Sequence, residues 1–177
     1  MIKLLSKLVF SNSQNEQSDS SSIDPEHDRY ALWHALPERH LVIFIDTGIL
    51  ISSDLQRSNE AVEEVERLLC ACPSVFLVFV DSTRVGLSRA HLTALFKAEY
   101  FDRLLGITQD FSKGQLHHPR AEECQEFVFM HRVKNYLVLD TDLSKYPQQF
   151  PPLILMKQDG HLTDDILKAV TDRYSTI

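Results

Sequence analysis

The sequence predicts an α/β domain in which a parallel sheet lies between two layers of helices. Runs of aliphatic and β-branched residues without polar alternation recur along the chain, as expected of strands buried on both faces. Segments with apolar residues at helical spacing separate these runs. Such an alternation of strands and helices is typical of three-layer folds with right-handed crossovers.

The first strand–helix–strand unit is predicted between residues 41 and 80. Its strands are LVIFI at 41–45 and VFLVFV at 75–80. Between them, Ser58 can cap a helix over the segment NEAVEEVERLLCA, because a serine hydroxyl accepts hydrogen bonds from the first turn. The apolar residues at helical spacing in this segment are Ala61, Val62, Val65, Leu68 and Leu69.

Two further helices are predicted in the middle of the chain. Ser88 can cap the first, which carries Ala90, Leu92, Leu95 and Phe96. An apolar segment, FDRLLGI, follows at 101–107. The second helix is marked by Ala121, Cys124, Phe127, Val128 and His131.

The C-terminal part of the sequence adds a third and a fourth strand and a last helix. The strands are YLVL at 136–139 and PPLILM at 151–156, where the prolines mark the start of a strand. Thr163 opens the helix, whose apolar residues are Ile166, Leu167, Val170 and Tyr174.

An N-terminal arm, residues 1–29, is predicted to precede the folded domain at 30–177. Its first part, MIKLLSKLVF, would place Ile2, Leu5 and Leu8 or Val9 on one face of a helix, opposite the lysines. This face could contact a membrane surface or a partner, or it could cap the domain. Residues 11–28 are rich in Ser, Asn, Gln and acids and are expected to be a disordered tether.

Composition limits the classes of function. A length of 177 residues suits a single domain. The 18 Lys and Arg residues stand against 25 Asp and Glu, which opposes broad nucleic-acid binding. We find no signal peptide and no apolar stretch long enough to span a membrane. Three cysteines, Cys70, Cys72 and Cys124, favour a reducing, cytoplasmic location.

Polar residues follow three of the predicted strands. These are Asp46, Thr47 and Gly48 after the first, Asp81, Ser82, Thr83 and Arg84 after the second, and Asp140, Thr141 and Asp142 after the third. Ligands of open parallel sheets bind at this edge. Clustered carboxylates with no lysine nearby would repel unless Mg²⁺ lay between them. The alternative is that these residues form turns and helix caps.

The motifs occur in the order IDTGIL, FVDSTR, HPRAEECQEFV, YLVLDTDLSKYP and LILMKQDGHLT. This order resembles the haloacid-dehalogenase-like (HAD-like) superfamily, over residues 40–174. The similarity is greatest to small, nearly capless bacterial and phage-type members, whose pattern runs LDxDGVL, SSWR, a helix opening with Arg and Glu, YVILDDD and a Gly-Leu-Thr helix. The resemblance implies a Rossmann-like core and phosphoryl transfer through an aspartyl-phosphate.

The first motif departs from the family pattern. Aligned on Gly48 without a gap, Ile45 stands at the nucleophile position and Thr47 replaces the acid/base. A one-residue deletion restores Asp46 as the nucleophile. Gly48 would then belong to the phosphate-binding loop.

The other motifs supply the remaining implied roles. Ser82 would donate a hydrogen bond to the phosphate, although Asp81 competes for its position, and Arg84 and Arg120 would balance the phosphate charge. Asp46, Asp140 and Asp142 would bind Mg²⁺, with Thr141 replacing the middle acid of the fourth motif.

Two hypotheses of different classes follow. The first is a Mg²⁺-dependent phosphohydrolase acting on a small phosphorylated substrate through Asp46. The second is a catalytically degenerate HAD-like module, a pseudoenzyme, that binds a metabolite or a protein partner. The second hypothesis is motivated by Thr47 in place of the acid/base, the acid Asp81, Thr141 in place of the middle acid of the fourth motif and the possible Ile45 alignment.

Overall fold

The computed structural model of the protein describes residues 31–51, 56–80, 86–113, 116–156 and 162–177. It contains a five-stranded parallel sheet in the order β3-β2-β1-β4-β5, which is Rossmann-like. The predicted α/β fold class is therefore confirmed. The strands are β1 (Leu41–Asp46), β2 (Val75–Val80), β3 (Leu104–Ile107), β4 (Tyr136–Asp140) and β5 (Leu153–Leu155).

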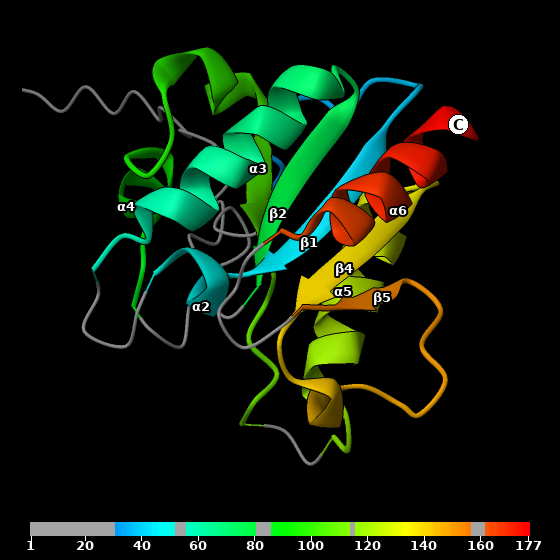
Figure 1. Ribbon diagram of the computed structural model, residues 1–177. Coiled ribbons are helices and arrows are strands. Elements are labelled where there is room, and N and C mark those ends of the chain that lie inside the picture. The colour runs from blue at the N-terminus through cyan, green and yellow to red at the C-terminus, as the bar shows by residue number, and fades with distance from the viewer. Residues whose placement is uncertain (1–30, 52–55, 81–85, 114–115, 157–161) are drawn as a thin grey trace, which may run out of the picture.

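Helices connect the strands and pack on both faces of the sheet (Figure 1). The α-helices are α2 (Thr47–Leu50), α3 (Asn59–Ala71), α4 (Arg89–Thr93), α5 (Pro119–His131) and α6 (Asp164–Ser175), and the 3₁₀ helices are η1 (Ala98–Arg103) and η2 (Leu143–Lys145). The predicted arm, residues 1–29, lies outside the described residues. Within the described ranges, no helix is both long and apolar enough to cross a bilayer.

Alternating side chains of the strands divide the core into two layers. In β1, Leu41, Ile43 and Ile45 pack with α3, α4 and α6 on one face. Val42 and Phe44 pack with α5 on the other. Figure 1 shows α3 and α6 in front of the sheet and α5 behind it. Among the described residues α5 is the one α-helix on its face, so that face has the thinner cover.

The prediction was wrong about the segment 101–107, which was not assigned as a strand. Its second half forms β3, pairs with β2 and makes the sheet five-stranded. Only four residues form this strand and one of them is Gly106, so the segment lacks the long apolar run that identified the others. Its partner β2 stabilises it as an edge strand.

The helix predicted after Ser88 is shorter than expected. Ser88 does cap α4, in a capping box with His91, but the helix ends at Thr93. Beyond its end, Glu66 of α3 accepts from the Lys97 backbone N–H at 2.8 Å and lies 3.0 Å from Lys97 Nζ. Leu95 and Phe96 are buried beyond the helix rather than on it.

Candidate functional site

Asp46 and Asp140 are the last residues of two neighbouring strands. β1 and β4 pair in parallel, with Ile45 opposite Leu139, so the next residue of each strand reaches the same edge of the sheet. Ile45 packs into the α3 side of the core, and the alternation of side chains turns Asp46 toward α5. Both acids are buried, with Asp46 5% and Asp140 0% exposed.

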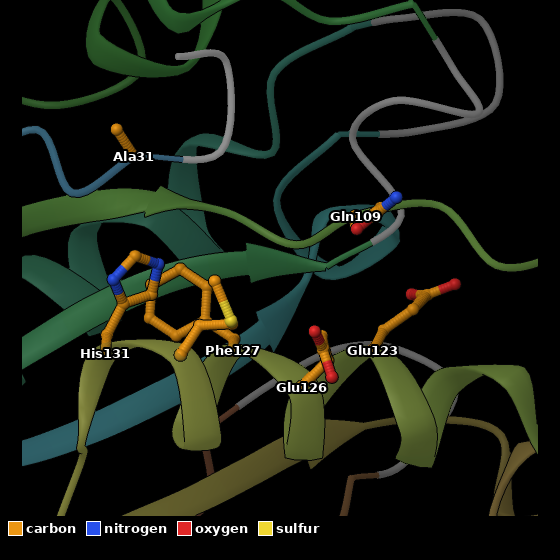
Figure 2. A pocket seen from close by; sticks show the side chains of 7 residues that line it. Ala31, Gln109, Glu123, Glu126, Phe127 and His131 are labelled. Carbon is orange, nitrogen blue, oxygen red and sulfur yellow. The ribbon is translucent and has the colours of Figure 1, made fainter. Parts of the chain in front are cut away.

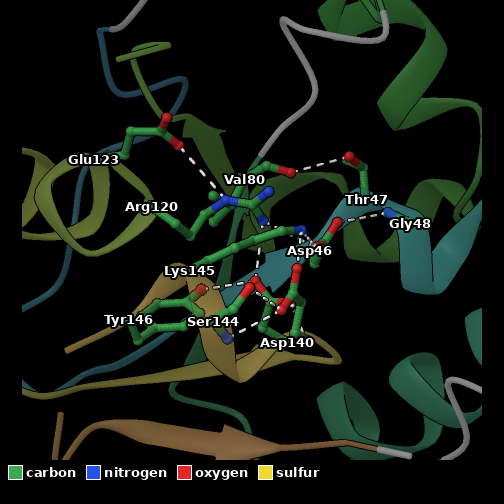
Figure 3. A network of polar contacts seen from close by, with 11 residues as sticks. Asp46, Thr47, Gly48, Val80, Arg120, Glu123, Asp140, Ser144, Lys145 and Tyr146 are labelled. Atoms are coloured by element: carbon green, nitrogen blue, oxygen red, sulfur yellow. Dashed lines mark hydrogen bonds and ion pairs between the residues drawn. The ribbon is translucent and has the colours of Figure 1, made fainter. Parts of the chain in front are cut away.

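Arg120, in the first turn of α5, lies between these two carboxylates (Figure 3). Its side chain is completely buried. One nitrogen, Nη1, donates to Asp46 Oδ2 at 2.9 Å and to Asp140 Oδ2 at 3.0 Å. Its Nε lies 3.8 Å from Glu123 Oε2, one turn further along the helix. The guanidinium therefore joins α5 to the ends of both central strands.

The turn after β4 adds a second cation and a hydroxyl donor. Lys145 Nζ lies 3.4 Å from Asp46 Oδ2 and 3.8 Å from Asp142 Oδ2. The Tyr146 hydroxyl donates to Asp140 Oδ2 at 2.8 Å, and the Asp142 N–H donates to Asp140 Oδ1 at 2.9 Å. The expectation of carboxylates without a nearby lysine was wrong, because η2 brings Lys145 back over the end of β1.

The other predicted residues of the first motif make local contacts. The Thr47 hydroxyl, which is buried, donates to the Val80 carbonyl at 3.0 Å and so joins the ends of β1 and β2. The Gly48 N–H donates to Asp46 Oδ1 at 2.8 Å, which makes Asp46 the N-cap of α2. A Cβ at Gly48 would lie 3.2 Å from that same oxygen. The hydrogen bonds of Thr47 to Val80 and of Gly48 to Asp46 are both typical of a turn from a strand into a helix.

Asp142 lies at the rim of the site, with its side chain 43% exposed. Its Oδ1 accepts from the Ser144 N–H at 3.0 Å and from the Ser144 hydroxyl at 2.6 Å. Ser82, Arg84 and Asp81 lie outside the described residues. The structure therefore brings together Asp46, Arg120, Asp140 and, at the rim, Asp142.

Charge and burial act in opposite directions on the two central acids. Burial by itself raises the pKa of Asp46, but Arg120, the Gly48 N–H and Lys145 together outweigh it and hold that pKa below its ordinary value. Burial, followed by repulsion from Asp46, raises the pKa of Asp140 despite its bonds to Arg120 and Tyr146. Hydrogen bonding by Ser144 lowers the pKa of Asp142.

The described residues of this cluster do not fit a bound Mg²⁺. A hard cation would need free carboxylate oxygens pointing to one place. Here Asp46 Oδ2 and Asp140 Oδ2 both accept from Arg120 Nη1, and the remaining oxygen of each accepts a backbone N–H. Within the described part of the chain, no group of three or more His, Cys, Asp or Glu side chains is arranged to hold a metal ion.

Three participants were not identified in the sequence. Lys145 and Tyr146 follow Asp142 within the motif YLVLDTDLSKYP, and Glu123 follows Arg120 by three residues. The i to i+3 spacing of Arg120 and Glu123 on a predicted helix was the available signal. For Tyr146 there was none, because its hydroxyl reaches Asp140 only through the shape of the η2 turn.

The comparisons with known proteins identify no relative. No protein-family model matches the chain, and neither a curated protein nor a solved structure matches it. The fold and the geometry of the cluster are therefore the basis for an argument about function.

The pKa shifts of Asp46 and Asp140 predict opposite pH dependences of stability when each acid is replaced by asparagine. The Asp46 pKa is lowered on folding, so its ionisation stabilises the protein, and this contribution is lost as pH falls below 3.8. The Asp140 pKa is raised, so the cost of its ionisation grows as pH rises above 3.8. The stability of the wild type relative to Asp46→Asn should therefore increase with pH, whereas relative to Asp140→Asn it should decrease.

Urea unfolding between pH 3 and pH 7 measures both differences. Asp172→Asn, on the exposed surface of α6, is the matched control for removing one acid elsewhere. Slopes of the same sign for the Asp46 and Asp140 variants would contradict the assigned charge distribution.

Removing the Tyr146 hydroxyl is expected to destabilise the protein by about 1–3 kcal/mol, because a buried carboxylate loses a donor while the ring stays in place. Tyr146 is 3% exposed and packs on Phe150 with ring centroids 5.3 Å apart. The Tyr146→Phe variant should unfold at a lower urea concentration with an unchanged m-value. Equal stability of variant and wild type would show that Asp140 does not need this bond.

Proposed function

We propose that the chain is a catalytically degenerate HAD-like module that binds a protein or peptide segment instead of hydrolysing a phosphate ester. The observation that carries this proposal is the position of Arg120 Nη1, within 3.0 Å of both Asp46 Oδ2 and Asp140 Oδ2. A protein cation neutralises the two carboxylates that a catalytic metal would require. The HAD-like ancestry is part of the proposal and depends on the order of the five motifs.

The state of Asp46 also argues against catalysis. A carboxylate nucleophile must reach its substrate with a free oxygen, yet both oxygens of Asp46 are hydrogen-bonded and its side chain is 7% exposed. In the family pattern an acid stands two residues after the nucleophile, but here that position is Gly48. The neighbouring Thr47 hydroxyl donates to the Val80 carbonyl. Without an acid/base, protonation of the leaving group loses about 10²- to 10⁴-fold in rate.

The charges of the cluster favour a protein ligand over a phosphorylated metabolite. Asp46, Asp140, Asp142 and Glu123 are four acids, whereas Arg120 and Lys145 are two cations that already face them. A phosphate entering here would meet excess negative charge. Exposed apolar side chains on α5, Phe129 at 78% and Met130 at 51%, are instead typical of protein contacts.

One observation favours the phosphohydrolase as the second candidate. Asp46, and not Ile45, is the side chain that joins Arg120 and Asp140 at the sheet edge. This is the arrangement required if a one-residue deletion kept the nucleophile. Lys145, 30% exposed, would then face an incoming phosphate.

Hydrolysis of a generic aryl phosphate separates the two candidates. The full chain is assayed with and without Mg²⁺, beside Asp46→Asn and Asp140→Asn. The binding module is expected to show no Mg²⁺-dependent rate above that of the variants, in samples shown by circular dichroism to be folded. A metal-dependent rate that both substitutions abolish would overturn the proposal and establish the phosphohydrolase.

A further inference from the structure

A cavity of about 230 Å³ lies beside α5 and borders the charge cluster at Glu123 (Figure 2). One face of the helix forms its wall, with residues at spacings of three and four along α5. The lining residues are Glu123, Glu126, Phe127, Met130 and His131 of α5, together with Ala31 and Gln109. Phe127 forms the apolar floor and is 4% exposed, whereas Met130 at the rim is 51% exposed.

The topology explains why a cavity forms here. Among the described helices, α3, α4 and α6 cover one face of the sheet and α5 alone covers the other. Residues 31–36 run along the open edge of the sheet beside β3, where the Trp33 N–H donates to the Leu105 carbonyl at 2.7 Å. Leu32 and Leu36 pack against the α5 side of the core. Space remains between this segment and α5.

The dimensions of the cavity favour side chains over a metabolite. Small-molecule sites typically have volumes of about 300–1,000 Å³, and this cavity is smaller. A groove along a helix that accepts a few apolar side chains is instead the geometry by which amphipathic helices are recognised. Met130, which is 51% exposed, adds apolar surface at the edge of the cavity.

The position of Ala31 suggests the occupant. Ala31, the first described residue, lines the cavity, and residues 1–30 precede it in the sequence. Residues 1–10 are the one amphipathic stretch of that preceding sequence, with Ile2, Leu5 and Val9 on one helical face. They contain two lysines and no acid, and the exposed Glu126 at the cavity has the complementary charge.

The connecting residues have a suitable length. Residues 11–30 separate this stretch from Ala31. A flexible chain of that length has a root-mean-square span of about 25 Å, which reaches any part of α5, since a helix of 13 residues is about 20 Å long. Such a link gives an effective concentration of about millimolar, so even a weak contact would be populated.

We propose that residues 1–10 dock as an amphipathic helix into the cavity beside α5 of the same chain, with Ile2, Leu5 and Val9 against Phe127 and Met130 and the lysines near Glu126. This inference rests on the proposed binding function and assigns the segment that is bound. Its test has no phosphatase readout, so failure of one proposal is distinguishable from failure of the other.

Paramagnetic relaxation in the full chain tests the docking. A nitroxide is placed at residue 6 by Ser6→Cys in a Cys70→Ser background, since Cys70 is exposed while Cys72 and Cys124 are buried. We expect amide signals of residues 126–131 to lose intensity and those of residues 168–173 on the opposite face to keep it. Uniform intensity across α5 and α6 would overturn the proposal.

Two substitutions at the contact and one matched control complete the experiment. Leu5→Asp and Met130→Asp should each restore the α5 signals, whereas Gln125→Asp, an exposed position of α5 outside the cavity lining, should leave the intensity loss unchanged. Because Leu5 precedes the predicted domain at 30–177 in the sequence, its variant remains informative even if Met130→Asp perturbs α5. Intensity loss that survives both contact substitutions would overturn the proposal.

Other occupants give different results. Spin-labelled chain without ¹⁵N is mixed with ¹⁵N chain without a label, and loss of the α5 signals in that sample would assign the cavity to a second copy. Binding of residues 1–10 to vesicles of anionic phospholipid, with the α5 signals unaffected, would assign the segment to a membrane surface. Either result overturns docking within one chain.

Discussion

Replacing Arg120 by methionine is expected to lower the free energy of unfolding by about 3–5 kcal/mol, the usual cost of removing one partner from a buried ion pair. Arg120 is 0% exposed and lies within 4 Å of three carboxylates, those of Asp46, Glu123 and Asp140. Methionine fills much of the volume of the arginine stem but leaves these charges in a site of low dielectric. Urea unfolding followed by circular dichroism measures the change.

A second substitution separates charge from packing in this result. If uncompensated charge causes the loss, Asp140→Asn in the Arg120→Met background should recover part of the stability, because one buried carboxylate is removed. Arg173→Met, at an exposed position near the end of α6, is the matched control and should change stability by less than about 0.5 kcal/mol. A loss at Arg120 as small as that of the control would show that the cluster does not hold α5 on the sheet.

The sequence predicts most of the fold because the central strands are long apolar runs. β1, β2 and β4 are buried on both faces, and their segments contain no polar alternation. β3 could not be predicted in the same way, since its pairing with β2 and not its composition makes it a strand. The end of α4 could not be predicted either, because Leu95 and Phe96 continue the helical spacing of apolar residues in the sequence yet lie beyond the helix.

Two acids of the candidate site follow from the strand pattern, and Arg120 was named only through the family resemblance, whereas Lys145 was not named. Asp46 and Asp140 follow from the rule that residues after parallel strands meet at one edge of the sheet. An arginine at the start of a helix is ordinarily exposed, and nothing in its neighbours indicates that Arg120 is completely buried. Lys145 and Asp46 are 99 residues apart in the sequence, so no local sequence pattern could predict their contact.

The charge cluster and the cavity share one residue. Glu123 lines the cavity, lies 3.8 Å from Arg120 Nε, and accepts from the Phe111 N–H at 3.1 Å. It thus connects the loop after β3 to the start of α5. The position of α5 depends on ion pairs near its first turn and on apolar packing further along the helix, and the cavity borders both parts.

That packing is the subject of the second large prediction. Phe44 of β1 is 0% exposed and lies between two rings, with T-shaped contacts to Phe127 at 5.5 Å and to Tyr136 at 5.7 Å. Phe44→Ala removes a buried ring from the face covered by α5 and is expected to cost about 3–5 kcal/mol. Phe101→Ala, where the ring is 37% exposed, should cost much less.

Hydrogen exchange shows where this loss acts. Because Phe44 contacts α5 and not α3, the amides of residues 121–130 should exchange faster in Phe44→Ala than those of α3 under native conditions. Ile43→Ala, in the same strand but on the α3 face, should show the reverse order. Equal acceleration of both helices in both variants would mean that the two layers of the core unfold only together, and α5 could not then respond separately to a bound segment.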